Sequence, residues 1–498
     1  MKIKELWQNY RMLIVLILMT ILLSILGLQG MGTQSFVRTA LSGLTLGSLF
    51  FMVAAGLTLI FGLMDVLNFA HGSMFMLGAY MGWQFYTNPT FLFGIAPLIA
   101  AFIAGMSLLS VLQPMSVGWK LSDEWQQQLP RLLTILAVVL GFIALRGVDF
   151  LGLADTAMVS ITVTSTDPLA EISAQEPLGL FWFRPLLLMA TGGLMALASS
   201  RPGDKTRSVD KSAVRQGWIG FGLLSVLTVV LVLVRESGPI AVLLMNGDLR
   251  FVLALVVGTL SGFGLGVAVE RVLVRTLYVR PFFIVLMTLG LSFVIREVVQ
   301  LLWDPLAYQM SRPPAFSQPG KAPNLLAWFS GHNTTVDILG VTFPSYRIFI
   351  IFLGVIMFIG LILLMQRTRI GMIIRAGVQD REMVEALGIN VQRVFLLVFA
   401  LGTAMAALGG IGAAPFIPVK PEMGDAFQMQ GFITVVIGGM GSYVGAFIGA
   451  LLLGMARAFG DYFALKLSLS PAVAEASTVI IMVIVLLVKP AGLFGKKE

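Results

Sequence analysis

Long apolar segments recur along nearly the whole of this 498-residue chain, and they restrict it to one kind of fold. Hydrophobic residues make up 57% of the chain and charged residues only 12%, whereas an ordinary soluble domain is about 25% charged. A soluble protein of this length could not cover its surface with so few polar groups. The chain is therefore predicted to be all-α, a polytopic membrane helical bundle with about 12–13 hydrophobic segments.

The predicted spans follow from the length of about 20 residues that a helix needs to cross a bilayer. They are Met12–Leu28, Leu41–Met64, Ser73–Tyr86, Phe91–Leu112, Leu132–Leu145, Leu186–Ala198, Trp218–Val234, Phe251–Val269, Phe282–Leu302, Ile348–Met365, Val394–Ile417, Phe432–Ala456 and Val473–Val488. The first has the basic start of a signal peptide, but no small-residue cleavage pattern follows, which favours an uncleaved anchor.

Basic residues predict which loops face the cytoplasm. The basic stretches are the two ends of the chain and residues 201–215, 271–280 and 367–393, whereas the long loops 149–180 and 303–346 are poor in basic residues and are expected outside. These sides agree only if Phe432–Ala456 breaks at Gly438–Gly441. That segment is therefore predicted to be a discontinuous or re-entrant helix, which requires backbone buried in protein or lining a cavity.

The stretch Asn68-Phe69-Ala70-His71-Gly72 places polar residues between two apolar segments. Polar groups at membrane depth usually face a pathway, so these five residues are candidates for a broken helix that lines a translocation path. Alternatively, they form a short cytoplasmic turn in which Asn68 and His71 cap helix ends. Spacing alone favours neither interpretation.

Glycines repeat at intervals of four in two places. They are Gly43 and Gly47, and Gly441, Gly445 and Gly449. Such a face lets helices approach to backbone contact. Packing within the chain is the favoured interpretation, and a dedicated subunit interface is the alternative.

Adjacent charges also lie within the apolar run Phe282–Leu302. Arg296 and Glu297 diverge by about 100° on a helix, so they are poorly placed to neutralise each other and are expected to find other partners. They either line a polar path or extend toward the external surface.

The loop 367–393 is predicted to contain a short capped helix. Asp380 is a good N-cap, Glu382 lies in the first turn, and Gly388 suits the position after the last turn. The helix is predicted to cover Asp380, Arg381, Glu382, Met383, Val384, Glu385, Ala386, Leu387 and Gly388. Its apolar residues suit docking into a groove of a partner; resting on the bilayer surface is the alternative.

Signatures of other functions are absent from the sequence. It has no cysteine, no GxxxxGK[ST] phosphate loop, no HExxH and no GxSxG, so no catalytic residue, metal site or bound cofactor is predicted. The excess of 33 basic over 25 acidic residues is explained by cytoplasmic loops, and nucleic acid is not an expected partner.

Five separated blocks resemble the permeases of branched-chain amino acid ABC transporters, in the branch that carries the NFAHG signature. They are SGLTLGSLFFMVAAGLTLIFGLMDVLNFAHGSMFMLGAY (Ser42–Tyr80), the region around VERVLVRTLYVRP (Leu255–Gly290), the run from RAGVQDREMVEALGINVQR onward (Arg375–Gly410), VVIGGMGSYVGAFIGALLLG (Val435–Gly454) and KPAGLFG (Lys489–Gly495).

The resemblance implies a permease subunit in the inner membrane of a bacterium, with ATP-Mg bound by other subunits. It implies a second related permease, two cytoplasmic ATPases, a periplasmic binding protein and surrounding lipid as partners. It also implies that Asp380–Gly388 is the coupling helix that meets the ATPase, and it favours a path lined by Asn68 and His71.

The chain departs from this family between about Pro89 and Arg250. We therefore divide it into an N-terminal tip and anchor (1–38), a first permease block (39–88), an inserted block with about four extra spans (89–250) and a second permease block (251–498). An even number of inserted crossings keeps the orientation of the flanking blocks.

The cargo is expected to be branched-chain or other hydrophobic amino acids. The same machinery could instead import urea, short amides or another amino acid. An ion-coupled secondary transporter is disfavoured because no pair of carboxylates lies deep within the predicted spans.

Overall fold

The computed structural model describes residues 31–495 except 118, 120–121, 155–180, 201–210, 279, 380 and 471. The predicted anchor Met12–Leu28 lies outside the described residues. The chain divides into two compact units. Unit 1 holds the residues up to Trp83 and those from Gly247 onward, and unit 2 holds Gln84–Asn246.

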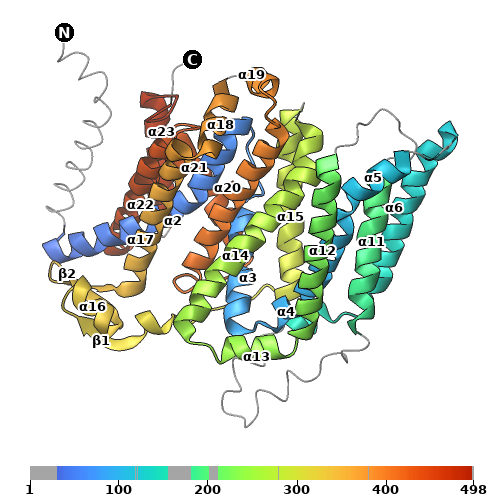
Figure 1. The fold of residues 1–498 in the computed structure, drawn as a ribbon. Helices are drawn as coiled ribbons and strands as arrows, with labels where there is room; N and C mark the ends of the chain where they lie inside the picture. The colour runs from blue at the N-terminus through green and yellow to red at the C-terminus, as the bar shows by residue number, and fades with distance from the viewer. Residues whose placement is uncertain are drawn as a thin grey trace. The chain divides into compact units, whose positions relative to one another are not determined.

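Unit 1 is a helical bundle with a small sheet at one end (Figure 1). Its helices are α2 (Thr33–Met64), α3 (His71–Thr87, whose last turn passes into unit 2), α14 (Gly247–Val269), α15 (Pro281–Trp303), α17 (Ser345–Arg367), α18 (Arg369–Gln379), α19 (Arg381–Ala386), α20 (Val391–Ala413), α21 (Met423–Gly438), α22 (Tyr443–Lys466) and α23 (Ala472–Val488). A π-helical turn at Glu270–Val274 and 3₁₀ turns at Arg275–Leu277 and Pro314–Phe316 complete it.

Helix α2 forms the core of unit 1, and its glycines let neighbouring helices pack closely against it. It packs against α17, α20, α21 and α22, and its residues from Leu49 to Ile60 are buried. A Cβ atom on Gly56 would overlap the backbone of Gly402 in α20, and one on Gly47 would overlap that of α22. Helices in lipid are not driven together by the hydrophobic effect, so close backbone packing of this kind is what stabilises their association.

The predicted break in Phe432–Ala456 is confirmed. Helix α21 ends at Gly438, Gly439 and Gly441 have φ of +98° and +80°, and α22 begins at Tyr443. With 16 residues, α21 is roughly 24 Å long at 1.5 Å per residue, shorter than the hydrocarbon core of about 30 Å. Positive φ is easily reached only by glycine, which explains why the break lies here.

The free end of α21 is satisfied by the last described segment of the chain. The N–H groups of Leu493 and Phe494 donate to the carbonyls of Ile437 and Gly438, at 2.8 and 3.0 Å. An unsatisfied carbonyl at membrane depth costs several kcal/mol. The fold-back of this segment is therefore what allows α21 to end inside the bundle.

The segment between α15 and α17 contains a sheet that was not predicted from the sequence. Strands β1 (Gln318–Ala322), β2 (Asn333–Ile338) and β3 (Val341–Pro344) are ordered β1-β2-β3, with β1 parallel and β3 antiparallel to β2. Helix α16 (Leu325–Gly331) connects the first two strands. Val336 and Phe343 are buried in a small core beneath the sheet.

One ion pair joins β1 to β2, and it makes this sheet sensitive to acid. Lys321 bonds to the Asp337 carboxylate and lowers the pKa of that group, and the Gly340 N–H also donates to it at 2.8 Å. Because the folded pKa is depressed, the stabilisation is present at neutral pH and is lost as pH falls through the folded value. Asp337→Asn is therefore expected to weaken amide-exchange protection of β2 and β3 at pH 6. The difference between the variant and the wild type should shrink as the pH is lowered below the ordinary pKa of an aspartate, and a difference that does not change with pH would contradict this account.

Unit 2 is a second helical bundle. Its helices are α4 (Thr90–Ser107), α5 (Leu109–Val117), α6 (Asp123–Leu145), α7 (Phe150–Ala154), α11 (Phe183–Ser199), α12 (Lys211–Leu233) and α13 (Ser237–Leu243). Helix α11 packs against α4 and α6, and α12 packs against α4. Gly105 and Gly192 allow α4 and α11 to meet backbone to backbone. Most apolar side chains of α6 and α12 are exposed, as expected for helices that face lipid.

The prediction of an all-α membrane bundle is confirmed for the described chain. Within it, nine helices are long and apolar enough to cross a membrane, and Phe183–Ser199 and Ala474–Val488 are shorter apolar helices. Each predicted span in the described ranges contains a helix, but Phe91–Leu112 is divided between α4 and α5, and α20 ends at Ala413, before the predicted end at Ile417.

Candidate functional site

The Asn68–Gly72 stretch connects α2 to α3 and is held by its own polar groups. The Asn68 side chain accepts from the Ala70 N–H at 3.0 Å, and the Asn68 carbonyl accepts from the His71 N–H at 3.3 Å. Asn68 thereby closes a local turn just before α3, as asparagine side chains commonly do. Asn68, Ala70, His71 and Gly72 are buried and Phe69 is half-buried.

This stretch lies beside α2, well away from the end of that helix. The Nε2 atom of His71 lies 3.1 Å from the carbonyl oxygen of Val53, which is 11 residues before the end of α2 at Met64. At 1.5 Å per residue that end is roughly 16 Å away. The chain therefore turns back into the bundle, and α3 begins at the depth of the middle of α2.

Two other helices hold the stretch in place. Thr288 of α15 accepts from the Phe69 N–H at 3.1 Å. Gln428 of α21 accepts from the Gly72 N–H at 2.5 Å and donates to the Asn68 carbonyl at 3.4 Å. Gln428 was not predicted from the sequence, because nothing local relates it to residues 356–360 positions earlier.

Two buried nitrogens in the stretch have no hydrogen-bond partner among the described residues. They are Nδ2 of Asn68 and Nδ1 of His71. A buried unpaired polar atom costs about 1–3 kcal/mol, so it is usually retained for a role. Gly72 packs directly against the backbone of α21, because a Cβ atom at this position would overlap the carbonyl of Gly424.

The glycine repeats lie at helix contacts inside unit 1. Gly43 and Gly47 face Met455 and Leu451 of α22. The remaining three lie at or after the break between α21 and α22. Gly441 faces Gly62 of α2, Gly445 faces Gly438 and Phe494, and Gly449 faces Thr434 and Gly438. Each of these glycines therefore packs against its own chain.

The candidate docking helix α19 covers Arg381–Ala386 and lies at the end of unit 1 opposite the sheet (Figure 1). Asp380 lies outside the described residues, and the side chains of Arg381 and Glu382 are not described. Val384 is buried, whereas Met383 and Leu387 are 62% and 73% exposed. Among the described side chains of this segment, Val384 is the buried one, whereas Met383 and Leu387, the residue that follows α19, are large apolar side chains that are mostly exposed.

Gly388 ends α19 in the geometry that its sequence predicts. Its φ is +78°, its N–H donates to the Glu385 carbonyl, and the Ile389 N–H donates to that of Val384. This pair of bonds is the Schellman motif, in which a left-handed residue closes the helix.

Gly388→Val is expected to loosen α19 by about 1–2 kcal/mol, because a β-branched residue is strained at positive φ. Faster protease cleavage within 381–390 should report it in the purified chain. Gly388→Asn tolerates the left-handed conformation and is the matched control. Equal cleavage rates in the two variants would show that the backbone angle does not hold the helix.

The described part of the chain contains no group of three or more His, Asp or Glu side chains arranged to hold a metal ion. The site is instead a break between helices that is held by backbone polar groups, the buried Asn68 side chain and the half-buried Gln428 side chain.

These features define a multi-pass helical membrane protein with discontinuous helices at its centre, an arrangement suited to moving a solute. The family model of the branched-chain amino acid transport system permease component matches residues 215–488, more than half of the chain. The chain belongs to this family.

Individual relatives agree with the family. The chain is 33% identical over 172 residues to the high-affinity branched-chain amino acid transport system permease protein LivH of Escherichia coli K12, covering 34% of this chain and 53% of that protein. It is 32% identical over 161 residues to BraD, a permease protein of the same description from Pseudomonas aeruginosa, covering 32% and 50%.

A weaker similarity reaches a permease named for another cargo. It is the ribose import permease protein RbsC of Escherichia coli K12, 31% identical over 123 residues, covering 23% of this chain and 36% of that protein. The chain spans about half the length of the first curated relatives that it matches. No solved structure matches it.

Proposed function

We propose that this chain is the membrane-spanning subunit of an ATP-driven importer in the inner membrane of a bacterium. Its cargo is branched-chain or other hydrophobic amino acids. The transport systems named for LivH and BraD support this cargo. The chain itself moves the solute, and it carries out no chemical step.

The exposed apolar face of α19 is the observation that carries the proposal. A helix of six residues is too short to be stable alone. Burying the exposed apolar side chains of Met383 and Leu387 against a partner would be favourable, because it removes apolar surface from water. Such a helix is suited to fill a groove in a partner. We propose that the partner with this groove is one of two ATPase subunits that bind ATP-Mg. Helix α19 is then the coupling helix.

The break at Asn68–Gly72 is assigned to the solute path. Solute release requires walls with few fixed charges, and Phe69, Ala70 and Gly72 meet that requirement. Movement of α19 would shift α20, which follows it directly and contacts Gly56 of α2 through Gly402. ATP-driven motion would thus reach α2 beside the break as a rigid-body lever.

The complete assembly contains a second related permease, which supplies the other half of the pore, and a periplasmic protein that delivers the solute. The decisive experiment isolates the chain from its native membrane in mild detergent, identifies co-purifying proteins and measures uptake of labelled leucine in proteoliposomes. Co-purifying ATPases and uptake that requires ATP are the expected results. A chain that purifies alone, or uptake driven by an ion gradient without ATP, would overturn the proposal, and uptake of urea or ribose in place of leucine would overturn its cargo.

A further inference from the structure

An ion pair joins α15 to α21 in a place where charges are costly. The Nη1 atom of Arg296 lies 2.8 Å from Oδ2 of Asp425, whereas its neighbour Glu297 is 3.6 Å from Nη2. Asp425 is thus the closer partner, as expected from the divergence of adjacent helical residues. Arg296 lies seven residues before the end of α15 at Trp303, roughly 10 Å along the helix axis.

The pair is accessible from outside this chain. The side chain of Arg296 is 27% exposed and that of Asp425 is 55% exposed. An ion pair on an apolar span is too costly to face lipid and normally faces a water-filled cavity or another protein. This face of α15 and α21 therefore lines the aqueous path or the subunit that completes it.

The same face leads directly to the Asn68–Gly72 break. Thr288, Ser292 and Arg296 are spaced by four and lie on one face of α15. The Thr288 hydroxyl accepts from the Phe69 N–H, and the backbone carbonyl of Ser292 accepts from the Ser73 hydroxyl at 3.5 Å. On α21, Asp425 lies one turn from Gln428, which bonds to Asn68 and Gly72. The charges thus lie one turn beyond the break, toward the end of α15 predicted to be external.

Building on the proposed function, we infer that the Arg296–Asp425 pair is a gate that opens for a zwitterion. Arg296 and Asp425 bind the carboxylate and the ammonium group of an α-amino acid, one each, as the pair separates. The Nε atom of Arg296 is buried with no hydrogen-bond partner among the described residues, so the guanidinium has a further donor to offer a carboxylate.

The exchange explains how an ion pair at membrane depth can open. Separating two partly desolvated charges leaves both without a partner, which is strongly unfavourable. A zwitterion replaces both partners at once with its carboxylate and its ammonium group, whereas urea or a short amide has no charged group to offer to Arg296 or Asp425. The gate therefore favours amino acids over neutral solutes, in addition to any selection by a delivery protein.

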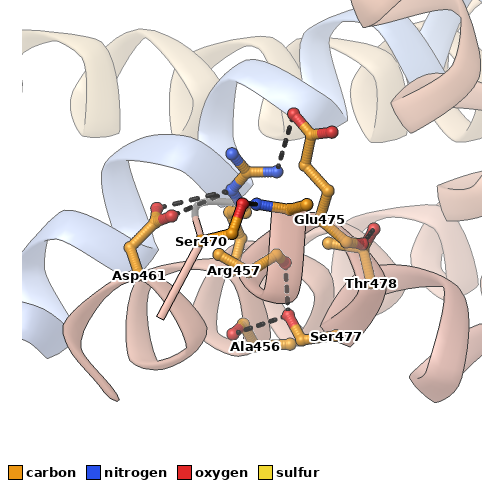
Figure 2. A network of polar contacts seen from close by, with 9 residues as sticks. Ala456, Arg457, Asp461, Ser470, Glu475, Ser477 and Thr478 are labelled. Atoms are coloured by element: carbon orange, nitrogen blue, oxygen red, sulfur yellow. Dashed lines mark hydrogen bonds and ion pairs between the residues drawn. The ribbon is translucent and has the colours of Figure 1, made fainter. Parts of the chain in front are cut away.

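A matched control exists on the same unit. Figure 2 shows Arg457 of α22 between Asp461, at 3.3 Å, and Glu475 of α23, at 3.5 Å. Arg457 is 21% exposed and Asp461 is 49% exposed, close to the values of the gate pair. Arg457→Gln thus removes a comparable ion pair that lies away from the break.

The test uses the full transporter complex in proteoliposomes, with ATP-dependent uptake of labelled leucine as the first measurement. Arg296→Gln is expected to lower uptake about tenfold or more, because it leaves Asp425 without its partner and the solute carboxylate without a cation. Arg296→Lys keeps the charge and should retain more uptake than Arg296→Gln. Arg457→Gln should stay within about twofold of wild type.

The second measurement separates solute contact from structural support. A diazirine analogue of leucine, activated by light during turnover, should cross-link to peptides of α15 or α21 in wild type and in Arg296→Lys. These cross-links should disappear in Arg296→Gln. Because the wild-type result stands by itself, it decides the matter even where Arg296→Gln does not fold.

Leucine uptake by the wild type distinguishes failure of the gate from failure of the importer proposal. Normal wild-type uptake together with unchanged uptake in Arg296→Gln, or with no cross-link to α15 or α21, overturns the gate and leaves the importer proposal intact. Absence of ATP-dependent leucine uptake in wild type overturns the importer proposal, and the gate with it.

Discussion

Replacing both Met383 and Leu387 with aspartate should abolish ATP-dependent uptake while the chain still folds and inserts. Both side chains are largely exposed, and surface substitutions usually change stability by less than about 0.5 kcal/mol. In the assembled transporter they would be buried in the ATPase groove. Placing one charge in such a contact costs about 2 kcal/mol or more, roughly thirtyfold in affinity.

The measurement is co-purification of the ATPase subunits with the tagged permease, followed by uptake in proteoliposomes. Leu326→Asp is the matched control, because Leu326 of α16 is 82% exposed and lies at the opposite end of unit 1 (Figure 1). It should retain the ATPase subunits. If the double aspartate variant retains them as fully as Leu326→Asp does, α19 is not the docking helix.

Local chemistry allowed the ends of several helices to be predicted from the sequence. The Gly388 cap of α19 follows from a single residue that tolerates positive φ. The break at Gly438–Gly441 was predicted from two independent signals, the count of basic loops and a run of glycines. The cap and the glycine run depend on residues close together in the chain, and the basic-loop count needs only the order of the loops along it, so the sequence contains enough information to locate both features.

Long-range pairing could not be predicted in this way. Nothing in the sequence near Asn68 points to Gln428, and the divergence of Arg296 and Glu297 indicated only that Arg296 needed another partner. Asp425 is 129 residues away. The sheet between α15 and α17 was missed because its strands are too short to be recognised: β1 reads QPGKA, and β2 (NTTVDI) and β3 (VTFP) each alternate over only two apolar residues, fewer than the roughly four to eight residues that mark a strand.

The position of the Asn68–Gly72 stretch shows the same limit. The sequence permitted either a path at membrane depth or a turn at a helix end, because spacing does not report how far a chain folds back. The contact of His71 with Val53 is tertiary information. The structure places the stretch beside the middle of α2, and its role in transport stays a prediction to be tested through Gln428.

Gln428→Leu is expected to lower the thermal stability of the purified chain and reduce uptake about tenfold or more. The side chain of Gln428 pairs the Gly72 N–H and the Asn68 carbonyl, and a leucine side chain offers neither group a hydrogen-bond partner. Each backbone group left unpaired costs about 1–3 kcal/mol. The break would then shift or close, although leucine matches glutamine in size.

Gln430→Leu provides the control within the same helix. The Oε1 atom of Gln430 is buried with no hydrogen-bond partner among the described residues, so an apolar replacement removes a desolvated polar atom and should leave stability unchanged or raise it. Thermal unfolding and leucine uptake measured on both variants separate the two roles of α21. Equal loss in both would mean that α21 tolerates no apolar substitution of glutamine, whereas loss in Gln428→Leu alone would show that one side chain holds the broken segment open. Retention of stability and uptake in Gln428→Leu would mean that the break is held by α2 and α15, and that Gln428 contributes nothing to the path.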